Sequence, residues 1–382
     1  MKIAQFLIFF GIVLLVYSAV NYYIFIRGYQ AIPSGTVWKK VFLVVFLFLA
    51  SSFVAGRILE KVWLSPVSDF FTWTGSFWLA LMLYFFLIVL AVDLVRLVDH
   101  FTGFLPEINQ NFKSRFLIAS ILTVFVIVAA GHINALTPQI RKLEITLPKK
   151  SERNSEMTIA FASDIHLGTI MGSRRAAGFA NRVNALNPDL ILLGGDILDE
   201  DLAPVLRLNI GDSLRKLKAP MGVIGITGNH EYIGGAEKAI KYLEEHGIMM
   251  LRDSSIVLPN DVVIIGREDR DMSRFEGKTR KKVSDLVNSA GSGLPTIMLD
   301  HQPFELDAKV KEGVDLTMSG HTHHGQMWPL SYVTKAIYEV SWGYAKRGNM
   351  HIYVSSGYGS WGPAVRIGNR PEIVFITLKF AG

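Results

Sequence analysis

The stretch SGHTHHGQMW, residues 319–328, places His321, His323 and His324 within four consecutive positions of a chain that has ten histidines. Imidazole is the commonest metal ligand in proteins and titrates closer to neutral pH than any other side chain. An isolated H-x-H is also compatible with a polar turn whose side chains face solvent. The choice between these alternatives depends on the other donor side chains that the fold brings to the same place.

Five apolar runs of the sequence end in polar motifs of this kind. The motifs are SDIH (163–166), GGDILD (194–199), TGNHE (227–231), LDHQP (299–303) and SGHTHHG (319–325). Helical patterns such as residues 173–186 and 235–247 lie between the runs, which is typical of an α/β domain. Ligands bind beyond the carboxyl ends of strands in such folds. Turn-forming Asp, Asn and Gly explain any one motif but not all five, so we expect the donors to converge.

The first third of the chain has a different character. Half of the 382 residues are hydrophobic and only 19% are charged, and the apolar excess lies before about residue 135. Four apolar stretches, at 3–26, 38–56, 70–92 and 116–135, are each near the ~20 residues that cross a bilayer. Trp38, Trp63, Trp73 and Trp78 lie near their ends, as in an aromatic belt. We therefore expect four transmembrane helices in residues 1–136, a linker at 137–156 and a second domain at 157–382.

Charge distribution bears on orientation and partners. Loops on the side of the termini carry seven Lys and Arg residues and the opposite loops carry six. By the positive-inside rule this small difference favours a cytoplasmic second domain but does not decide the orientation. We expect an integral inner (plasma) membrane protein. The net charge of +6 is spread out apart from GKTRKK at 277–282, so we expect a bilayer partner and no nucleic acid. The chain has no cysteine, which excludes disulfides and thiolate metal sites.

The motif series resembles a known family. D-x-H at 164–166, G-D-x-x-D at 195–199, G-N-H-E at 228–231, His301 and G-H-T-H at 320–323 resemble the calcineurin-like metallophosphoesterases, over about residues 157–380. The ending YVSSGYG and PAVRIGNRPEIVFITL is similar to the membrane-associated branch, which includes bacterial membrane phosphodiesterases and UDP-2,3-diacylglucosamine pyrophosphatases. The resemblance implies a four-layer αββα sandwich behind the membrane helices.

The resemblance also implies a ligand set for two divalent ions. Asp164, His166 and His323 would bind one ion, Asn229, His301 and His321 the other, and Asp196 would bridge both. Independently of the family, two ions ~3.5–4 Å apart hold a phosphoryl group and activate water, and they need a bridging carboxylate. Nitrogen and oxygen donors without sulfur favour manganese, iron or zinc over calcium.

Further roles follow from the same resemblance. His230 would act as general acid or as a cation for the leaving oxygen, and Asp199 would orient it, although Asp199 could also only cap local backbone. His324 departs from the small residue that many relatives have after H-x-H. Together with Arg267, Asp269, Arg366 and Arg370, it is a candidate substrate contact, the alternative being an ordinary surface position.

These residues favour an enzyme: a membrane-anchored metal-dependent phosphoric ester hydrolase acting on a phosphoester or pyrophosphate bond, in a phospholipid or lipid-linked headgroup. One alternative is a soluble substrate with the helices only as an anchor. A second is a non-catalytic metal-binding scaffold or sensor, which the complete motif set disfavours. A transporter is a third, disfavoured because the apolar stretches have few central ionisable residues; Asp93 and Arg96 lie towards one end.

Overall fold

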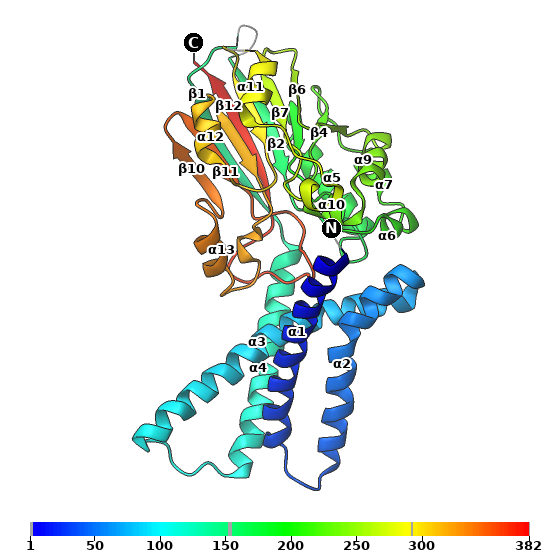
Figure 1. The fold of residues 1–382 in the computed structure, drawn as a ribbon, viewed down its shortest axis with the longest axis vertical. Coiled ribbons are helices and arrows are strands. Elements are labelled where there is room, and N and C mark those ends of the chain that lie inside the picture. Colours follow the sequence, from blue (N-terminus) through cyan, green and yellow to red (C-terminus); the bar gives the residue numbers. More distant parts are fainter. Residues whose placement is uncertain (1–2, 152–154, 292, 382) are drawn as a thin grey trace. The chain divides into compact units, whose positions relative to one another are not determined.

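The computed structural model describes residues 3–151, 155–291 and 293–381. They divide into two compact units (Figure 1). The helical unit holds the described residues up to Ile133 together with Gly362–Val365. The sheet unit holds Asn134–Trp361 and the described residues from Arg366 on.

The helical unit is built from four long helices. They are α1 (Ile3–Ala31), α2 (Val37–Val62), α3 (Pro66–Thr102) and α4 (Gln110–Leu136), the last ending just past the division between the units. Each contains a stretch long and apolar enough to cross a membrane, which confirms the four apolar helices expected from the sequence. Residues 362–365 belong to this unit because the Ser76 hydroxyl donates to the Gly362 carbonyl (2.8 Å), and His132 Nδ1 lies 2.7 Å from the Ala364 oxygen.

Small residues bring α2 and α3 into close contact. A Cβ atom added to Gly56 would meet the backbone nitrogen of Thr72 at 2.8 Å, and one on Gly75 would collide with the backbone of Phe53. Glycine at such positions lets helix backbones approach closely, which is how membrane helices gain packing contacts.

The sheet unit contains the remaining elements. Its strands are β1 (Gln139–Leu147), β2 (Glu156–Ala162), β3 (Leu190–Leu193), β4 (Val223–Gly225), β5 (Met249–Met250), β6 (Ser254–Val257), β7 (Val263–Gly266), β8 (Thr296–Leu299), β9 (Leu316–Ser319), β10 (Gly343–Arg347), β11 (Met350–Val354) and β12 (Glu372–Phe380). Its helices are α5 (Ser173–Asn184), α6 (Leu202–Arg207), α7 (Gly211–Leu214), α8 (Asn229–Gly234), α9 (Ala236–Glu245), α10 (Met272–Glu276), α11 (Val283–Ala290), α12 (Leu306–Lys311), α13 (Ser331–Ile337) and a 3-10 turn at His323–Gly325.

The strands form two six-stranded mixed sheets, ordered β1-β12-β2-β3-β4-β5 and β10-β11-β9-β8-β7-β6. Strands β2, β3 and β4 are parallel neighbours in the first sheet, and β7, β8 and β9 are parallel neighbours in the second. Because parallel strands end at the same edge, each sheet presents three successive loops at its carboxyl edge.

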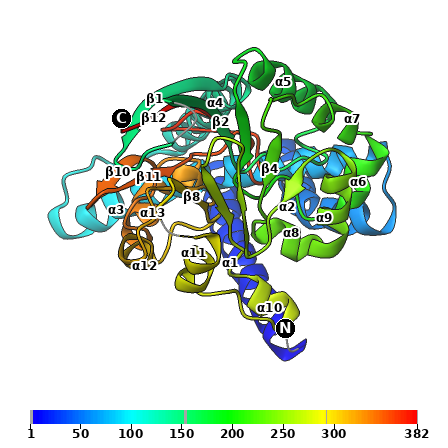
Figure 2. The ribbon, with the colours of Figure 1, turned by 90° about the horizontal axis from the view of Figure 1, so that it is seen from above.

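Side-chain alternation along the strands builds four layers. In β2, Ile159 and Phe161 face a core between the two sheets, and Ala160 and Ala162 face a second core under α5, α7 and α9. In β8, Met298 faces a third core under α11 and α12. Figure 2 shows these two groups of helices on opposite sides of the sheets. The expected αββα sandwich is confirmed.

The segment expected as a linker, residues 137–156, contains strand β1. Its residues pair in parallel with β12, from Gln139 opposite Glu372 to Leu147 opposite Phe380. Ile145 and Leu147 enter the core between the sheets, while Arg141 reaches the Glu372 carboxylate at 3.3 Å. The alternation is hard to recognise in the sequence because charged residues interrupt it and because its partner strand lies at the other end of the chain.

Candidate metal centre

The five polar motifs meet at one place because the carboxyl edges of both sheets meet there. They follow β2, β3 and β4 in the first sheet and β8 and β9 in the second. His301, after β8, places its Nε2 atom 3.1 Å from Asp196 Oδ2, after β3. The convergence expected from the sequence is therefore present.

One donor cluster consists of Asp164, His166 and His323, whose ligand atoms all lie within 4.8 Å of one another. The Nε2 atoms of His166 and His323 are 3.0 Å apart, and His323 Nε2 is 3.5 Å from Asp164 Oδ1. Two imidazole nitrogens and a carboxylate oxygen thus point at the same small volume.

A second cluster consists of Asp196, His301 and His321, again with ligand atoms within 4.8 Å of one another. The Asn229 side-chain oxygen adds a fourth donor, 2.8 Å from His321 Nδ1 and 3.3 Å from His301 Nε2. Asp196 Oδ2 also lies 3.8 Å from His166 Nε2, so this carboxylate stands between the two clusters.

The protonation states of His321, His323 and Asp196 favour metal binding. Burial, helped by the neighbouring His301, lowers the pKa of His321 to about 3, and burial with His166 beside it holds the pKa of His323 well below its usual range. Both imidazoles are neutral at physiological pH and keep a lone pair for a ligand bond. Burial opposes ionisation of Asp196, but His301 and His230 outweigh it and keep the pKa of this carboxyl well below normal. Two neutral imidazoles beside a buried carboxylate fit a divalent cation. Burial opposes ionisation of His301, but Asp196 and Asp164 outweigh it and raise the pKa of this imidazole well above normal, so a metal ion at this site would displace a proton from His301.

Backbone strain is concentrated at the same residues. Five of the expected ligands have left-handed backbone angles, with φ of 51° at Asp164 and His166, 49° at Asp196, 68° at His321 and 45° at His323. A non-glycine residue in this region costs roughly 1–2 kcal/mol and persists only where the surroundings impose it. The strain turns each side chain sharply off the end of its strand, towards the common centre.

Glu231 is a supporting residue of the site to which the sequence analysis gave no role, although it belongs to the G-N-H-E motif. Its buried carboxylate accepts hydrogen bonds from the backbone N–H groups of Asp196 (3.0 Å), Leu198 (2.9 Å) and Gly228 (2.7 Å). It therefore ties the loop after β3 to the start of α8. The available signal was its position: a Glu three residues after Gly228 is where a capping box places its acidic side chain.

Gly228 supports Asp196 through close approach. A Cβ atom at this position would meet the Asp196 Cγ atom at 2.8 Å and its backbone nitrogen at 2.5 Å. We expect Gly228→Ala to displace this carboxylate and to weaken Mn²⁺ binding by about 10–100-fold, the usual cost of disturbing a ligand's support. Isothermal titration with Mn²⁺ measures the effect. Gly178→Ala is the matched control, because a Cβ there meets nothing within 4 Å; equal affinities in both variants would contradict the prediction.

His230 and Asp199 form a pair beside the first cluster. His230 Nδ1 is 3.0 Å from Asp199 Oδ1, and its ring centroid lies 4.5 Å from that of His166. Burial alone would lower the pKa of His230, but Asp196 and Asp199 outweigh it and raise the pKa to about 9. The ring is therefore protonated at neutral pH, in the state that a general acid requires.

The candidate substrate contacts lie in varied surroundings. Arg267 is buried and paired with Asp300 (2.9 Å) and Glu305 (2.6 Å). Asp269 is buried, and the side-chain nitrogen of Gln302 donates to both of its carboxylate oxygens, at 3.0 and 3.1 Å.

The other three candidates come from the part of the chain that follows β9. Arg366 is buried behind His323, with a guanidinium nitrogen 3.2 Å from His323 Nδ1. His324 is also buried and packs on Trp342, with ring centroids 5.0 Å apart. Arg370 reaches the Asn134 side-chain oxygen at 3.2 Å. In these positions Arg366 supports a candidate ligand, and neither His324 nor Arg370 touches the two donor clusters through any contact found among the described residues.

Comparison with known proteins places the chain in a family. The model of the calcineurin-like phosphoesterases matches residues 157–325. A metallophosphoesterase of Helicobacter pylori is 30% identical over 278 residues, covering 72% of this chain and 73% of the relative. The chain belongs to the calcineurin-like metallophosphoesterases.

Other metallophosphoesterases are similar over the helical unit as well. A metallophosphoesterase of Campylobacter jejuni is 28% identical over 387 residues, covering 98% of this chain and 99% of the relative. A transmembrane protein with metallophosphoesterase domain from Danio rerio is 28% identical and covers 99% of this chain and 90% of its own length. The resemblance found in the sequence is confirmed, and apolar helices joined to a metallophosphoesterase domain indicate a membrane-bound phosphoesterase.

Proposed function

We propose that this metallophosphoesterase uses two divalent metal ions, manganese, iron or zinc, to hydrolyse a phosphoester or pyrophosphate bond in a phospholipid or lipid-linked headgroup. The observation that carries the proposal is the place of Asp196, whose buried carboxylate stands between the two donor clusters. A carboxylate in that position is what a pair of ions needs as a bridge.

The chain's own residues would bind the metal ions, donate a proton and orient the donor. When bound, the ions supply an activated water and hold the phosphoryl oxygens. Asp164, His166 and His323 would hold one ion, and Asn229, His301 and His321 the other. The Nδ1 atom of His230 faces the Asp199 carboxylate. Its Nε2 atom would therefore be the one that gives a proton to the leaving oxygen. Asp199 fixes the ring orientation and stabilises its positive charge.

The lipid substrate is inferred from the membrane attachment. One helix would suffice to tether an enzyme, and the described residues form four that are long and apolar enough to span a bilayer. Only Thr137 and Pro138 separate the end of α4 from the start of β1. So short a connection keeps the sheet unit within reach of lipid headgroups. On the small imbalance of loop charge we place the sheet unit on the cytoplasmic side of the inner membrane.

The test compares the full chain with a fragment beginning at Thr137, which retains β1, in mixed detergent–lipid micelles. We expect both to hydrolyse bis(4-nitrophenyl) phosphate at similar rates. The full chain should hydrolyse a phospholipid or a lipid-linked pyrophosphate faster by roughly 100-fold, because anchoring raises the effective substrate concentration.

Metal content and circular dichroism of the fragment are the controls for folding. If the fragment processes the lipid as fast as the full chain, the helices have no role with the substrate and serve only as an anchor, and the inference of a lipid substrate from the helices fails. A screen of nucleotide diesters, phospholipids and lipid-linked pyrophosphates with the full chain then identifies the substrate class.

A further inference from the structure

Strand β7, which pairs with β8, is not followed by a candidate metal ligand, although its carboxyl end lies at the same edge of the sheet as those of β8 and β9. Strands β7, β8 and β9 are consecutive parallel neighbours, and His301 and His321 follow the latter two. The residues after β7 therefore lie at the same edge of the sheet. Arg267 and Asp269 are buried in this loop, and Arg270 is exposed.

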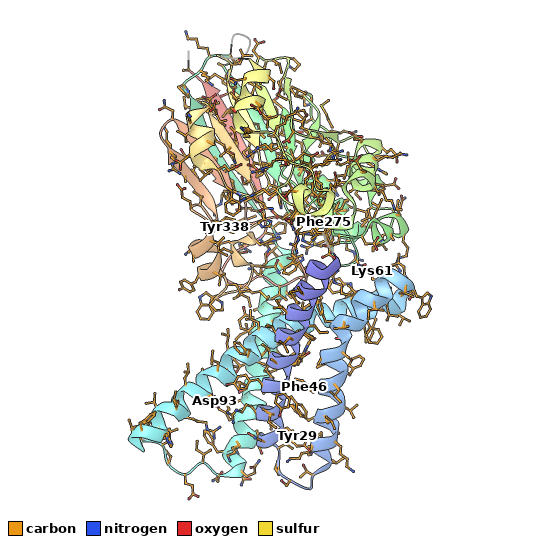
Figure 3. The ribbon with its side chains drawn as sticks, viewed as in Figure 1. Tyr29, Phe46, Lys61, Asp93, Phe275 and Tyr338 are labelled. Carbon is orange, nitrogen blue, oxygen red and sulfur yellow. The ribbon has the colours of Figure 1, made fainter. Side chains whose placement is uncertain are left out.

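A row of aromatic side chains connects Arg270 to the second donor cluster. The Arg270 guanidinium lies over the Phe304 ring, 4.3 Å from its centroid. The Phe304 ring is 5.0 Å from that of Tyr338, which follows α13 and is labelled in Figure 3. The Tyr338 ring is in turn 6.1 Å from that of His321. Phe304 and Tyr338 are only half-buried, so the row presents an open surface next to a candidate metal ligand.

Arg270 is held in place by its neighbours. The Gln302 amide donates to both carboxylate oxygens of Asp269, and the Asp271 N–H donates to Asp269 Oδ1 at 2.8 Å. Gln302 directly follows His301, so these bonds fix the Arg270 loop against the metal centre. Within the described part of the chain, no carboxylate lies within ion-pair distance of the Arg270 guanidinium. Its charge is therefore available to a ligand.

Arg270 and His230 connect to different donor clusters. His230 is next to His166 in the first cluster, and Tyr338 is next to His321 in the second. A phosphodiester or pyrophosphate has two substituents on the reacting phosphorus. In the proposed function the substituent beside His230 receives a proton and leaves, so a substituent that extends past the second cluster towards Arg270 would be the one that stays on phosphorus.

We propose that Arg270, supported by Phe304 and Tyr338, binds an anionic group on the retained substituent of the substrate, a second phosphate or a carboxylate. A guanidinium binds either anion through two parallel N–H bonds, and a ring beneath its face leaves those edge N–H groups free. This inference rests on the proposed function and adds that the substrate is a diester or pyrophosphate rather than a monoester.

The experiment uses full-length protein in detergent micelles with Mn²⁺ and three chromogenic diesters. All release 4-nitrophenol, and the retained substituent is methyl, carboxymethyl or 2-phosphoethyl. We expect Arg270→Gln to lower kcat/KM by about tenfold for the two anionic substrates, the lower end for a bond to a charged group, and to leave the methyl substrate unchanged. Arg274→Gln is the matched control, because it removes the same charge from an exposed position of the same segment.

Phe304→Leu removes the ring beneath the guanidinium and should give a smaller loss with the same selectivity. A loss confined to the phosphoethyl substrate identifies the anion as a second phosphate, and a loss confined to the carboxymethyl substrate identifies it as a carboxylate. Equal losses on all three substrates, or no loss on any of them, in a variant with normal metal content would overturn the role of Arg270 and leave the proposed function standing. If metal-loaded wild-type protein hydrolyses none of the three, the proposed function fails, and this inference fails with it.

Discussion

Asp196→Asn should lose bound metal and turnover together. The Asp196 carboxylate is buried, 3.1 Å from His301 Nε2 and 3.8 Å from His166 Nε2, so it is the donor that both clusters share. Asparagine keeps the shape and removes the negative charge that two neighbouring cations require. We expect Mn²⁺ affinity to fall by more than roughly 100-fold, beyond the upper end for residues that only support a ligand.

Metal analysis after dialysis against buffered Mn²⁺, followed by turnover of bis(4-nitrophenyl) phosphate, measures both effects. Asp285→Asn is a suitable control, since this exposed carboxylate on α11 lies outside both clusters. Circular dichroism checks that the Asp196 variant is folded. A folded Asp196→Asn protein that held two ions per chain and kept full turnover would sink the two-metal assignment.

The sequence predicted the helices and the strand exits because their signals are local. A run of apolar residues of membrane-spanning length has that property wherever it lies in the chain. Likewise, a buried strand followed by Asp, Asn or His is visible within ten residues, and the parallel arrangement of such strands brings their ends together. The donor clusters therefore follow from motifs at 164–166, 195–199, 228–231, 301 and 320–323 once the α/β fold is recognised.

The parts that the sequence did not predict depend on contacts between distant residues. Strand β1 forms because its residues pair with β12, beginning with Gln139 opposite Glu372. No local sequence pattern predicts a partner strand so far along the chain. Arg267 and Arg366 are candidate phosphate ligands by residue type alone. Asp300 and Glu305 enclose the first, and the loop around Gly359 encloses the second, whose guanidinium donates to the Gly359 carbonyl at 2.6 Å.

The direction of each ligand side chain was equally hidden. Left-handed backbone at Asp164 or His323 is unfavourable in isolation, so local propensity argues against it. It is imposed from outside, by bonds such as that from the His321 N–H to Asp164 Oδ1 (2.8 Å) and those that Glu231 accepts. Sequence reasoning is weakest where function has selected a strained conformation.

His230→Ala is expected to separate the chemistry from metal binding. His230 contributes no atom to the two expected ligand sets, so the variant should keep its metal. Turnover of a diester with a poor alkyl leaving group should fall by about 10²–10⁴-fold, the usual contribution of general acid catalysis. A 4-nitrophenyl ester should lose much less, because nitrophenolate leaves without a proton.

The pH profile gives a second and independent measurement of the same role. Asp196 and Asp199 raise the pKa of His230 to about 9, so its acid form is present below that pH and is lost as the pH rises through it. Wild-type turnover of the alkyl diester should therefore decline above about pH 9, and His230→Ala should lack this decline. Asp199→Asn removes a negative partner 3.0 Å from Nδ1, which should move the decline to lower pH. Equal losses on the alkyl and nitrophenyl esters in His230→Ala would instead mean that the imidazolium stabilises charge on the phosphoryl group without donating its proton.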